Sequence, residues 1–350
     1  MNRQLALILL PVAALLISRA GLPAYQAPPL QPHHTAAGFI NPWPGLLQSE
    51  HGFGDILKWQ RGRTERSPRY RESLGRFPLR EPDRTVLDSP GEGLQLTWLG
   101  HASFLVQLGG FNILTDPHLG ERASPVSWAG PRRITGAPLS ADQLPPIDVV
   151  VISHNHYDHL DKGTVLALGN GPAWYVPLGL KSWLNDLGIT HVVELDWWQD
   201  STHPGGLSIT CLPARHFSSR TLWDRDKNLW AGWWLEAAGQ RVYFAGDTGY
   251  GPHFAAIGRR LGPPDVALLP IGAYRPRWFM APVHIDPAEA VQAHLDLGAV
   301  RSIAMHWGTF ILAAEPVDEP PQLYRAAAES AGLSPDQAVL LEHGQTLILP

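Results

Sequence analysis

The chain has 350 residues, of which 44% are hydrophobic, and it carries a formal net charge of −5 at pH 7. This length and apolar content suffice for a large buried core, which excludes a disordered or fibrous protein. The single cysteine, Cys211, excludes an internal disulfide and an all-thiolate metal site, so a bound metal would need imidazole and carboxylate ligands. The acidic balance argues against a protein that binds nucleic acid through a basic surface.

The first residues resemble a secretory signal peptide. Arg3 precedes an apolar run from Leu5 to Ile17, and Ser18-Arg19-Ala20 follows as a weak cleavage site. The run is shorter than the about 20 apolar residues that span a bilayer, and Pro11 interrupts it. We therefore expect residues 1–22 to be a signal peptide or membrane anchor, and the protein to be exported or membrane-tethered, on the periplasmic side in a bacterium. A buried N-terminal helix is the alternative.

Residues 23–90 are rich in proline, arginine and aromatic residues and show little periodicity, which is typical of an irregular arm. One helix is predicted within it, near Asp55–Arg61. From Leu94 onward, short apolar runs between turn residues predict one large domain over residues 91–350. Its predicted strands are Leu94–Trp98, Ser103–Leu108, Phe111–Thr115, Val149–Ile152, Trp174–Val176, His191–Glu194, Leu207–Leu212, Trp230–Leu235, Arg241–Ala245, Val266–Pro270 and Ser302–Met305.

Helices are expected between these strands, and the clearest is Pro287–Leu297. Asp286 can accept hydrogen bonds from the first-turn amides, Glu289 completes a capping box, and Gly298 permits a left-handed exit. Strands in two groups with interspersed helices predict a mixed α/β (α+β) fold, specifically a four-layer αββα sandwich.

The most informative motif directly follows an apolar strand and reads His154-Asn155-His156-Tyr157-Asp158-His159. A turn at a strand end lets side chains two residues apart converge, so His154 and His156 can bind one metal ion. Asp158 and His159, one turn further on, then face a second ion. Two metals about 3.5–4 Å apart can activate a water molecule between them. The alternative is a solvated histidine-rich loop, but such a density of ligand-type residues rarely follows a buried strand without a metal.

Three later strand ends supply the remaining ligand-type side chains, His216, Asp247 and His306. Glycines flank Asp247, so the backbone can approach closely and leave its carboxylate free to bridge both metals. Each residue alone is weak evidence, because a single polar residue at a strand end is more often a cap or a surface residue. Together they predict one site from His154, His156, His216 and Asp247, and a second from Asp158, His159, Asp247 and His306.

Two zinc ions per chain are the predicted cofactors. The ligand set is rich in imidazole and lacks thiolate, and a metal used for hydrolysis should be redox-silent, which favours zinc over copper or iron. Manganese or iron is the alternative. His101 and Asp116 each follow an apolar strand and could orient the ligands through hydrogen bonds. Simple turn chemistry is the alternative for both.

The ordered ligand set resembles the metallo-β-lactamase superfamily, and longer segments resemble one branch of it, the N-acyl-phosphatidylethanolamine-hydrolysing phospholipase D family. The resemblance extends from about Gly38 to the C-terminus. The segments that carry it are Asn41–Pro44, Trp98–Ser103, Thr115–Pro117, Arg122–Pro125 with Gly130–Pro131, Ile152–Asp161, Gly246–Tyr250, Arg277–Met280 leading to His284–Pro287, and His306–Phe310.

This resemblance implies a zinc-dependent phosphodiesterase that releases N-acylethanolamine and phosphatidic acid. The seven ligands carry over position by position, and His284 matches a histidine that lies near the substrate in that family. We therefore expect Asp158, Asp247 and His284 to be catalytic. For His284, the alternative is a residue beside the Asp286 helix cap with no catalytic duty.

Substrate contacts are predicted in the same region of the chain. Arg275 or Arg277 could stabilise charge on the phosphoryl oxygens, although solvated surface positions are the alternative for both. Tryptophans expected in loops could line an acyl groove or lie at a membrane surface, namely Trp223, Trp278 and Trp307. Those expected in a strand belong to the core instead, namely Trp230, Trp233 and Trp234.

Two other functions are compatible with the sequence. A hydrolase of the same fold could act on another ester, lactone or phosphodiester, and a non-catalytic lipid-binding protein could share the fold. The latter would be expected to have lost ligands, and all seven are present. The expected partners are a phospholipid substrate and a membrane surface, with no nucleic acid, and a homodimer is left open.

Overall fold

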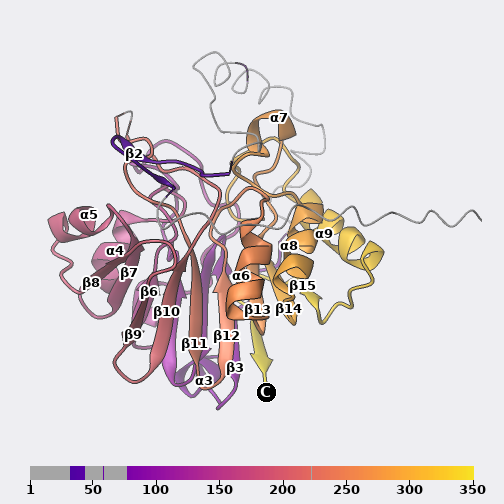
Figure 1. Ribbon diagram of the computed structural model, residues 1–350. Helices are drawn as coiled ribbons and strands as arrows, with labels where there is room; N and C mark the ends of the chain where they lie inside the picture. The colour runs from indigo at the N-terminus through magenta and orange to yellow at the C-terminus, as the bar shows by residue number, and fades with distance from the viewer. Residues whose placement is uncertain (1–31, 44–57, 59–76, 222) are drawn as a thin grey trace, which may run out of the picture.

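Two seven-stranded sheets face each other in the part of the chain that the computed structural model describes, namely residues 32–43, 58, 77–221 and 223–350 (Figure 1). The first sheet has the order β16-β3-β4-β5-β6-β7-β8. Its strands are β3 (Leu94–Gly100), β4 (Ser103–Leu108), β5 (Phe111–Thr115), β6 (Val149–Val151), β7 (Ala173–Pro177), β8 (Val192–Leu195) and β16 (Thr346–Leu349).

The second sheet has the order β15-β14-β13-β12-β11-β10-β9. Its strands are β9 (Asp200–His203), β10 (Leu207–Leu212), β11 (Gly232–Ala237), β12 (Gln240–Phe244), β13 (Val266–Pro270), β14 (Arg301–Met305) and β15 (Ala338–Val339). Neighbouring strands β12, β13 and β14 are parallel, as are β5, β6 and β7 in the first sheet. Each sheet is therefore mixed, and the carboxyl ends of its parallel strands lie at one edge.

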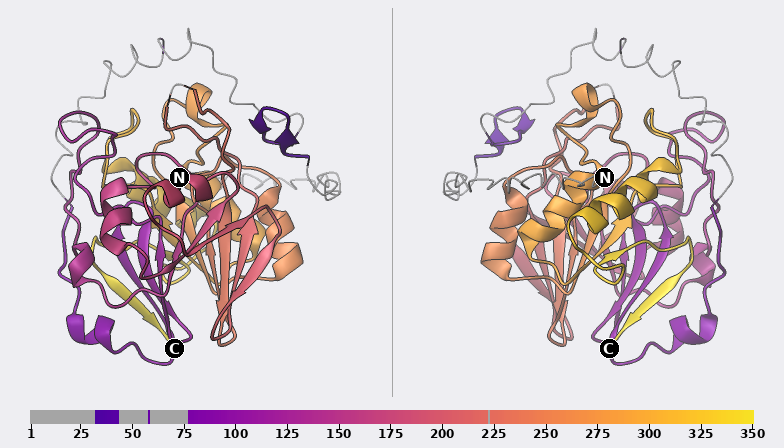
Figure 2. Two further views of the ribbon diagram at one scale, coloured as in Figure 1. Left: turned by 90° about the vertical axis from the view of Figure 1, so that its left-hand side faces the viewer. Right: turned by 90° about the vertical axis from the view of Figure 1, so that its right-hand side faces the viewer.

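Helices cover the outer face of each sheet, so the predicted four-layer αββα sandwich is confirmed (Figure 2). Apolar residues of α3 (Arg84–Asp88), α4 (Lys162–Leu168) and α5 (Lys181–Asp186) pack on the first sheet. Those of α6 (His253–Leu261), α8 (Pro287–Leu297) and α9 (Glu319–Ser330) belong to the larger core cluster, which also fills the space between the sheets.

The predicted strands all form, with shifts of one or two residues at some ends. Trp230 lies just before β11 but is buried, like Trp233 and Trp234. Three strands at the sheet edges were not predicted. Of these, β9 reads Asp-Ser-Thr-His and has no apolar residue, while β15 has only two residues and β16 has four. An edge strand pairs on one side only, so it needs little of the apolar pattern that marks a central strand.

Helix α8 begins and ends at the predicted residues. The Asp286 side chain accepts hydrogen bonds from the amides of Ala288 and Glu289, and the Glu289 carboxylate accepts from the Asp286 amide. Gly298 ends the helix with a φ of 65°. The short helix α3 lies within the stretch that was expected to be irregular. The helix predicted near Asp55–Arg61 lies outside the described residues, apart from Lys58.

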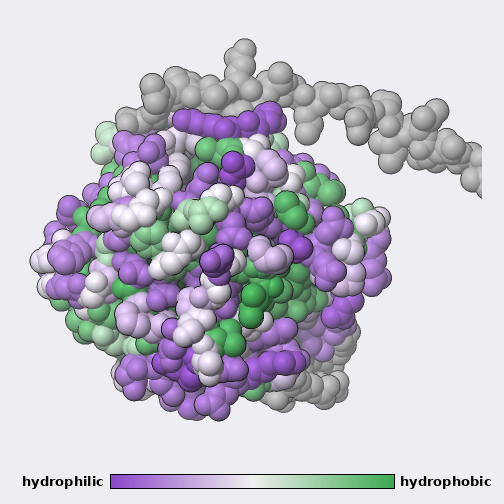
Figure 3. Space-filling model, turned by 90° about the horizontal axis from the view of Figure 1, so that it is seen from below, coloured by the Kyte–Doolittle hydropathy of each residue, from purple (hydrophilic) through white to green (hydrophobic). Residues whose placement is uncertain are grey.

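The N-terminal arm contributes a small hairpin of β1 (His34–Thr35) and β2 (Gly38–Phe39), which packs on the domain. Among the described residues, no helix is both long and apolar enough to cross a membrane. At the end of the molecule seen from below, apolar residues form small groups among polar ones (Figure 3).

Candidate metal centre

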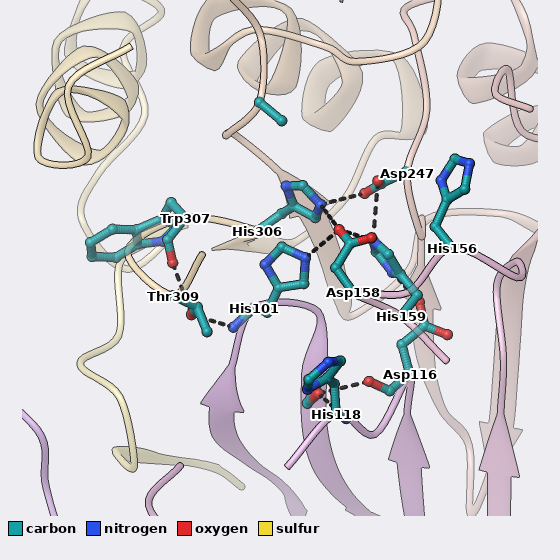
Figure 4. A network of polar contacts seen from close by, with 12 residues as sticks. His101, Asp116, His118, His156, Asp158, His159, Asp247, His306, Trp307 and Thr309 are labelled. Atoms are coloured by element: carbon teal, nitrogen blue, oxygen red, sulfur yellow. Dashed lines mark hydrogen bonds and ion pairs between the residues drawn. The ribbon is translucent and has the colours of Figure 1, made fainter. Parts of the chain in front are cut away.

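The predicted ligands follow strands of both sheets, and five of them are labelled close together in Figure 4, namely His156, Asp158, His159, Asp247 and His306. His154 to His159 form the loop after β6 in the first sheet. The other three ligands come from the second sheet, His216 after β10, Asp247 after β12 and His306 after β14.

Three histidines form the first cluster, His154, His156 and His216, with ligand atoms within 4.8 Å of one another. Nδ1 of His156 lies 2.8 Å from Nε2 of His154 and 3.2 Å from Nε2 of His216. The Asp247 carboxylate lies beside them, with Oδ2 4.0 Å from Nε2 of His154 and 3.9 Å from Nε2 of His216. This is the set predicted for one ion.

Asp158, His159 and His306 form the second cluster, with His101 beside them. Oδ2 of Asp158 lies 3.3 Å from Nε2 of His159 and 3.4 Å from Nε2 of His306. Asp247 reaches this cluster too, at 3.1 Å from His159 and 3.2 Å from His306. The Asp247 carboxylate therefore lies between the two clusters, where a bridging ligand would be.

Hydrogen bonds hold the ligand rings in place. Asp116 accepts from the backbone amide of Ser153 at 2.6 Å and lies 2.7 Å from Nδ1 of His159. Nδ1 of His154 lies 2.8 Å from Oγ of Ser153, and Nδ1 of His216 lies 2.8 Å from the Val283 carbonyl. In each case the partner holds Nδ1 and leaves Nε2 available as a metal ligand.

His101 contacts the same centre from the end of β3. Its Nε2 lies 2.9 Å from Oδ2 of Asp158, and its backbone carbonyl accepts a hydrogen bond from the His306 amide at 3.0 Å. His101, Asp116 and His306 all adopt positive φ, at 56°, 33° and 63°. This conformation costs free energy for residues other than glycine, and such strain is concentrated at functional sites.

The first cluster is electrostatically suited to bind a cation. Burial lowers the pKa of His154 well below its ordinary value, that of His156 to about 3 and that of His216 to about 4. These rings are therefore neutral at pH 7, which is the form of histidine that binds a metal.

The second cluster is charged. Burial alone would raise the pKa of Asp247, but the histidines around it, above all His159 and His306, hold that pKa well below its ordinary value. Burial alone would lower the pKa of His306, but the Asp247 and Asp158 carboxylates raise it to about 9. The same two carboxylates raise the pKa of His159 well above its ordinary value. The protons on the His159 and His306 rings supply positive charge at the position that a bound cation would occupy.

Several buried polar atoms of the centre lack hydrogen-bond partners, which bears on whether a metal ion fits there. Nε2 of His159, Nε2 of His306 and Oδ1 of Asp247 are buried, and no described residue gives them a hydrogen bond of normal geometry. Burying polar atoms without hydrogen bonds costs free energy, so their convergence is explained if an ion binds there. Imidazole nitrogens and carboxylate oxygens are also the donor set that zinc accepts.

All seven predicted ligands are thus brought together, although their role as ligands stays a prediction. His284 lies at the edge of the centre, with Nδ1 buried, unpaired among the described residues and 3.9 Å from Oδ2 of Asp247. The two arginines are engaged elsewhere. Arg277 pairs with Glu289 at 2.6 Å and donates to the His284 carbonyl, while Arg275 pairs with Glu319 at 2.8 Å. The geometry therefore gives Arg277 a part in holding His284 and does not direct either guanidinium at the centre.

The predicted loop tryptophans differ from one another in position. Trp307 is buried against Trp98, at 5.1 Å between ring centroids, so it belongs to the core. Trp278 lies in the short helix α7 (Arg277–Met280), with Lys58 over its ring. Trp223 is exposed, with 81% of its surface accessible.

Sequence reasoning missed Ser153 and Arg220, which position the loop after β6. One nitrogen of Arg220, Nη1, donates to the carbonyls of Asn155 and Leu160, at 2.9 and 2.8 Å. The guanidinium lies 4.1 Å from the centre of the Tyr157 ring. A lone arginine in a loop carries no signal of such a role, whereas Ser153 could have been singled out because it precedes the motif directly.

A cavity of about 270 Å³ opens beside this loop. The residues that line it include Pro125, Asn155, Tyr157, Arg220 and Thr221. The loop His154–His159, called the metal loop below, therefore borders solvent-accessible space.

Comparisons with known proteins find relatives of this chain in sequence and in fold. Residues 111–307 match the family model described as a beta-lactamase superfamily domain. The chain is 45% identical to the N-acyl-phosphatidylethanolamine-hydrolyzing phospholipase D 1 of Caenorhabditis elegans, over 67% of this chain and 70% of that protein. It is 37% identical to the mitochondrial N-acyl-phosphatidylethanolamine-hydrolyzing phospholipase D of Saccharomyces cerevisiae, over 71% of this chain and 55% of that protein.

Among solved structures, the chain is similar to Igni18, described as a novel metallo hydrolase of the archaeon Ignicoccus hospitalis. The two share 26% sequence identity and a TM-score of 0.57, over 73% of this chain and 98% of the other.

Proposed function

We propose a specific reaction for this chain, which belongs to the metallo-β-lactamase superfamily and, within it, to the N-acyl-phosphatidylethanolamine-hydrolysing phospholipase D family. The chain is a metal-dependent hydrolase. The chain hydrolyses N-acyl-phosphatidylethanolamine to N-acylethanolamine and phosphatidic acid, with two zinc ions in the centre around Asp247. The observation that carries this proposal is the position of the Asp247 carboxylate between two histidine clusters, in a chain so similar to two phospholipases of that name.

The residues of the centre have separate roles in the proposed reaction. Two bound zinc ions would make water a nucleophile near neutral pH and neutralise charge that develops on the phosphoryl oxygens. Asp247 bridges the two clusters and fixes their separation. Asp158 completes the second cluster and is itself held by His101 at 2.9 Å.

His284 is the proposed substrate contact. Its buried Nδ1 has no hydrogen-bond partner among the described residues and faces the centre next to Asp247. It can therefore exchange a hydrogen bond with a phosphoryl or leaving-group oxygen. Arg277 donates a hydrogen bond to the His284 carbonyl, at 2.8 Å, and so helps to position this residue.

Two exposed tryptophans support access from a membrane surface. Trp128 and Trp223 have 80% and 81% of their surface accessible. They belong to the loops that also supply Pro125 and Thr221 to the cavity beside the metal loop. Tryptophan favours the boundary between water and lipid, so both loops could rest on a bilayer while the substrate headgroup reaches the centre.

The test is product analysis with N-acyl-phosphatidylethanolamine in mixed micelles and protein of measured metal content. We expect N-acylethanolamine and phosphatidic acid in equal amounts, and none from Asp247→Asn. A simple phosphodiester without acyl chains serves as the comparison substrate. If the metal-loaded protein cleaves that compound but leaves the lipid intact, the fold and the centre stand and the substrate proposal is wrong.

A further inference from the structure

A second group of metal-ligating side chains lies apart from the residues of the centre around Asp247. His33 and His34 of the N-terminal arm converge on Asp196, which follows β8. Nε2 of His33 lies 2.7 Å from Oδ1 of Asp196, and Nε2 of His34 lies 2.9 Å from Oδ2. His33 lies in a turn and His34 begins β1, so the two rings are not bound to opposite faces of a strand and can converge on one carboxylate.

We propose that His33, His34 and Asp196 bind a divalent transition-metal ion of the zinc class, separate from the centre at Asp247. Bonds of about 2.0 Å in a tetrahedral arrangement place neighbouring ligand atoms about 3.3 Å apart. The two nitrogens lie slightly closer than this to the carboxylate oxygens, and one ligand atom of each of the three side chains lies within 4.8 Å of the others.

The surroundings hold two of the ligands rigidly. His33 and Asp196 are buried, and the His33 ring stacks on Trp197 at 4.1 Å between centroids. Oδ1 of Asp196 also accepts a hydrogen bond from the Trp197 amide at 2.8 Å, which orients the carboxylate. Such outer contacts fix a ligand before the ion arrives and thereby strengthen binding.

The third ligand provides the way in. The His34 side chain is 32% exposed, so solvent reaches the group from that side. An ion can enter there, and water can occupy the fourth coordination position. Three protein ligands with one open position make a site that zinc accepts.

An ion in this place fastens the arm to the domain. A few residues after His34, the Asn41 side chain donates to the His216 carbonyl at 2.8 Å, and the Trp43 ring stacks on Trp197. The same short segment thus contacts Asp196 at one end and the backbone of a predicted ligand of the main centre at the other. Binding at His34 should therefore stabilise the arm and, through it, the His216 loop.

A hydrogen-bonded clasp without metal is the competing account, and His34→Gln separates the two. Glutamine can still donate a hydrogen bond to Asp196 but replaces the imidazole ligand with an amide, which zinc binds poorly. We expect zinc-loaded wild-type protein to bind one more equivalent of zinc than His34→Gln, measured by mass spectrometry of the metal after gel filtration. The exposed His191 provides the control, and His191→Gln should bind as much zinc as the wild type.

The same comparison is made in an Asp247→Asn background, so that a failure at the main centre is distinguishable from a failure here. The difference of one equivalent should persist in that background. Equal zinc contents of wild type and His34→Gln in both backgrounds would overturn the proposal.

Zinc-edge anomalous diffraction from wild-type crystals gives a second answer that needs no variant. A peak among His33, His34 and Asp196 is expected. No peak at full zinc loading would overturn the proposal independently of how His34→Gln folds.

Discussion

Asp116 is the residue through which the first sheet controls the metal centre. Its carboxylate holds both the Ser153 amide, at 2.6 Å, and Nδ1 of His159, at 2.7 Å, so it fixes the start of the metal loop and the ring at its end. Asp116→Asn would keep the size of the side chain but lose its charge and one of its acceptor atoms. We expect zinc affinity to fall by about 10- to 100-fold, which is typical when a group that orients a metal ligand is removed.

Chelator competition measures this loss. Asp186→Asn, at the exposed end of α5, is the matched control and should bind zinc like the wild type. Unchanged affinity in Asp116→Asn would mean that His159 is held without it.

His343 makes the protein sensitive to acid. Burial lowers its pKa to about 3, and Nε2 lies 2.9 Å from Oγ1 of Thr309, which in turn accepts a hydrogen bond from the His101 amide. Histidine in the unfolded chain binds a proton below a pH of about 6.5. The unfolded state therefore binds more protons than the folded state between about pH 6.5 and pH 3, and stability falls as the pH is lowered through this window.

His343→Gln should remove about 2 kcal/mol of the stability loss between about pH 7 and pH 5. The measurement is urea unfolding of metal-stripped protein at several pH values, so that metal release does not contribute. Variant and wild type are compared by how steeply their free energy of unfolding changes with pH, because the substitution also alters packing against Trp98. His343→Gln would leave the slope unchanged if the ring were already charged in the folded protein.

At the scale of single residues, the sequence predicted which side chains converge but not what holds them. His154 and His156 could be paired from their spacing, and Asp247 from its flanking glycines. Arg220 could not be found, because its partners are backbone carbonyls, which every residue carries. Arg277 was expected at the substrate, whereas its pairing with Glu289 depends on how α7 and α8 approach each other, which no local pattern records.

At the scale of elements, the turn after β12 places Asp247 between the sheets. Gly246 adopts a φ of +59°, and a Cβ there would lie 2.5 Å from Cβ of Ser153 and 3.0 Å from the Ala231 carbonyl. Gly246→Ala must therefore push the turn away from the loop after β6. We expect this variant to lose both stability and zinc affinity.

Gly239, in the β11–β12 hairpin, is the matched control. It has a φ of +77°, but nothing lies within 4 Å of its added Cβ. Gly239→Ala should lose only the backbone penalty of about 1 kcal/mol, with zinc affinity unchanged. Urea midpoints and chelator competition test both variants, and equal losses in the two would show that the contact with Ser153 is unimportant.

The elements themselves were predicted where their own residues decide the structure. Helix α8 carries its cap, its capping box and its terminal glycine in the sequence, and central strands such as β13 are continuous apolar runs. Strand β9 forms because β10 offers it an edge, in the register that pairs Thr202 with Ser208. Its existence depends on a neighbour and not on its own composition, so it was missed.

At the scale of the whole molecule, bound metal would join the two halves of the sandwich. Ligands in the loop after β6 belong to the first sheet, and His216, Asp247 and His306 belong to the second. An ion that binds only the folded chain stabilises it by about 4 kcal/mol at a concentration a thousand times its dissociation constant. Metal removal should therefore lower the stability of the entire domain in a single transition.

Calorimetry of zinc-loaded and chelator-treated protein checks this expectation. Asp247→Asn should respond much less to the chelator than the wild type. Two separate transitions, or no change on metal removal, would mean that the ions do not link the sheets.

The packing of the arm on the domain exceeds what the sequence could predict. Its composition indicated an irregular segment, and the structure places His33, Asn41 and Trp43 against residues far along the chain. Contacts of this kind join segments separated by more than 150 residues, so they follow from the assembled fold and not from a local pattern.

The most direct test of the account is lipid hydrolysis during zinc titration of chelator-stripped protein. N-acylethanolamine release should be absent at the start and rise with the zinc bound, whereas Asp247→Asn should remain inactive at every zinc concentration. Full hydrolysis by the stripped protein, or none by the zinc-loaded protein, would contradict a zinc-dependent lipid phosphodiesterase.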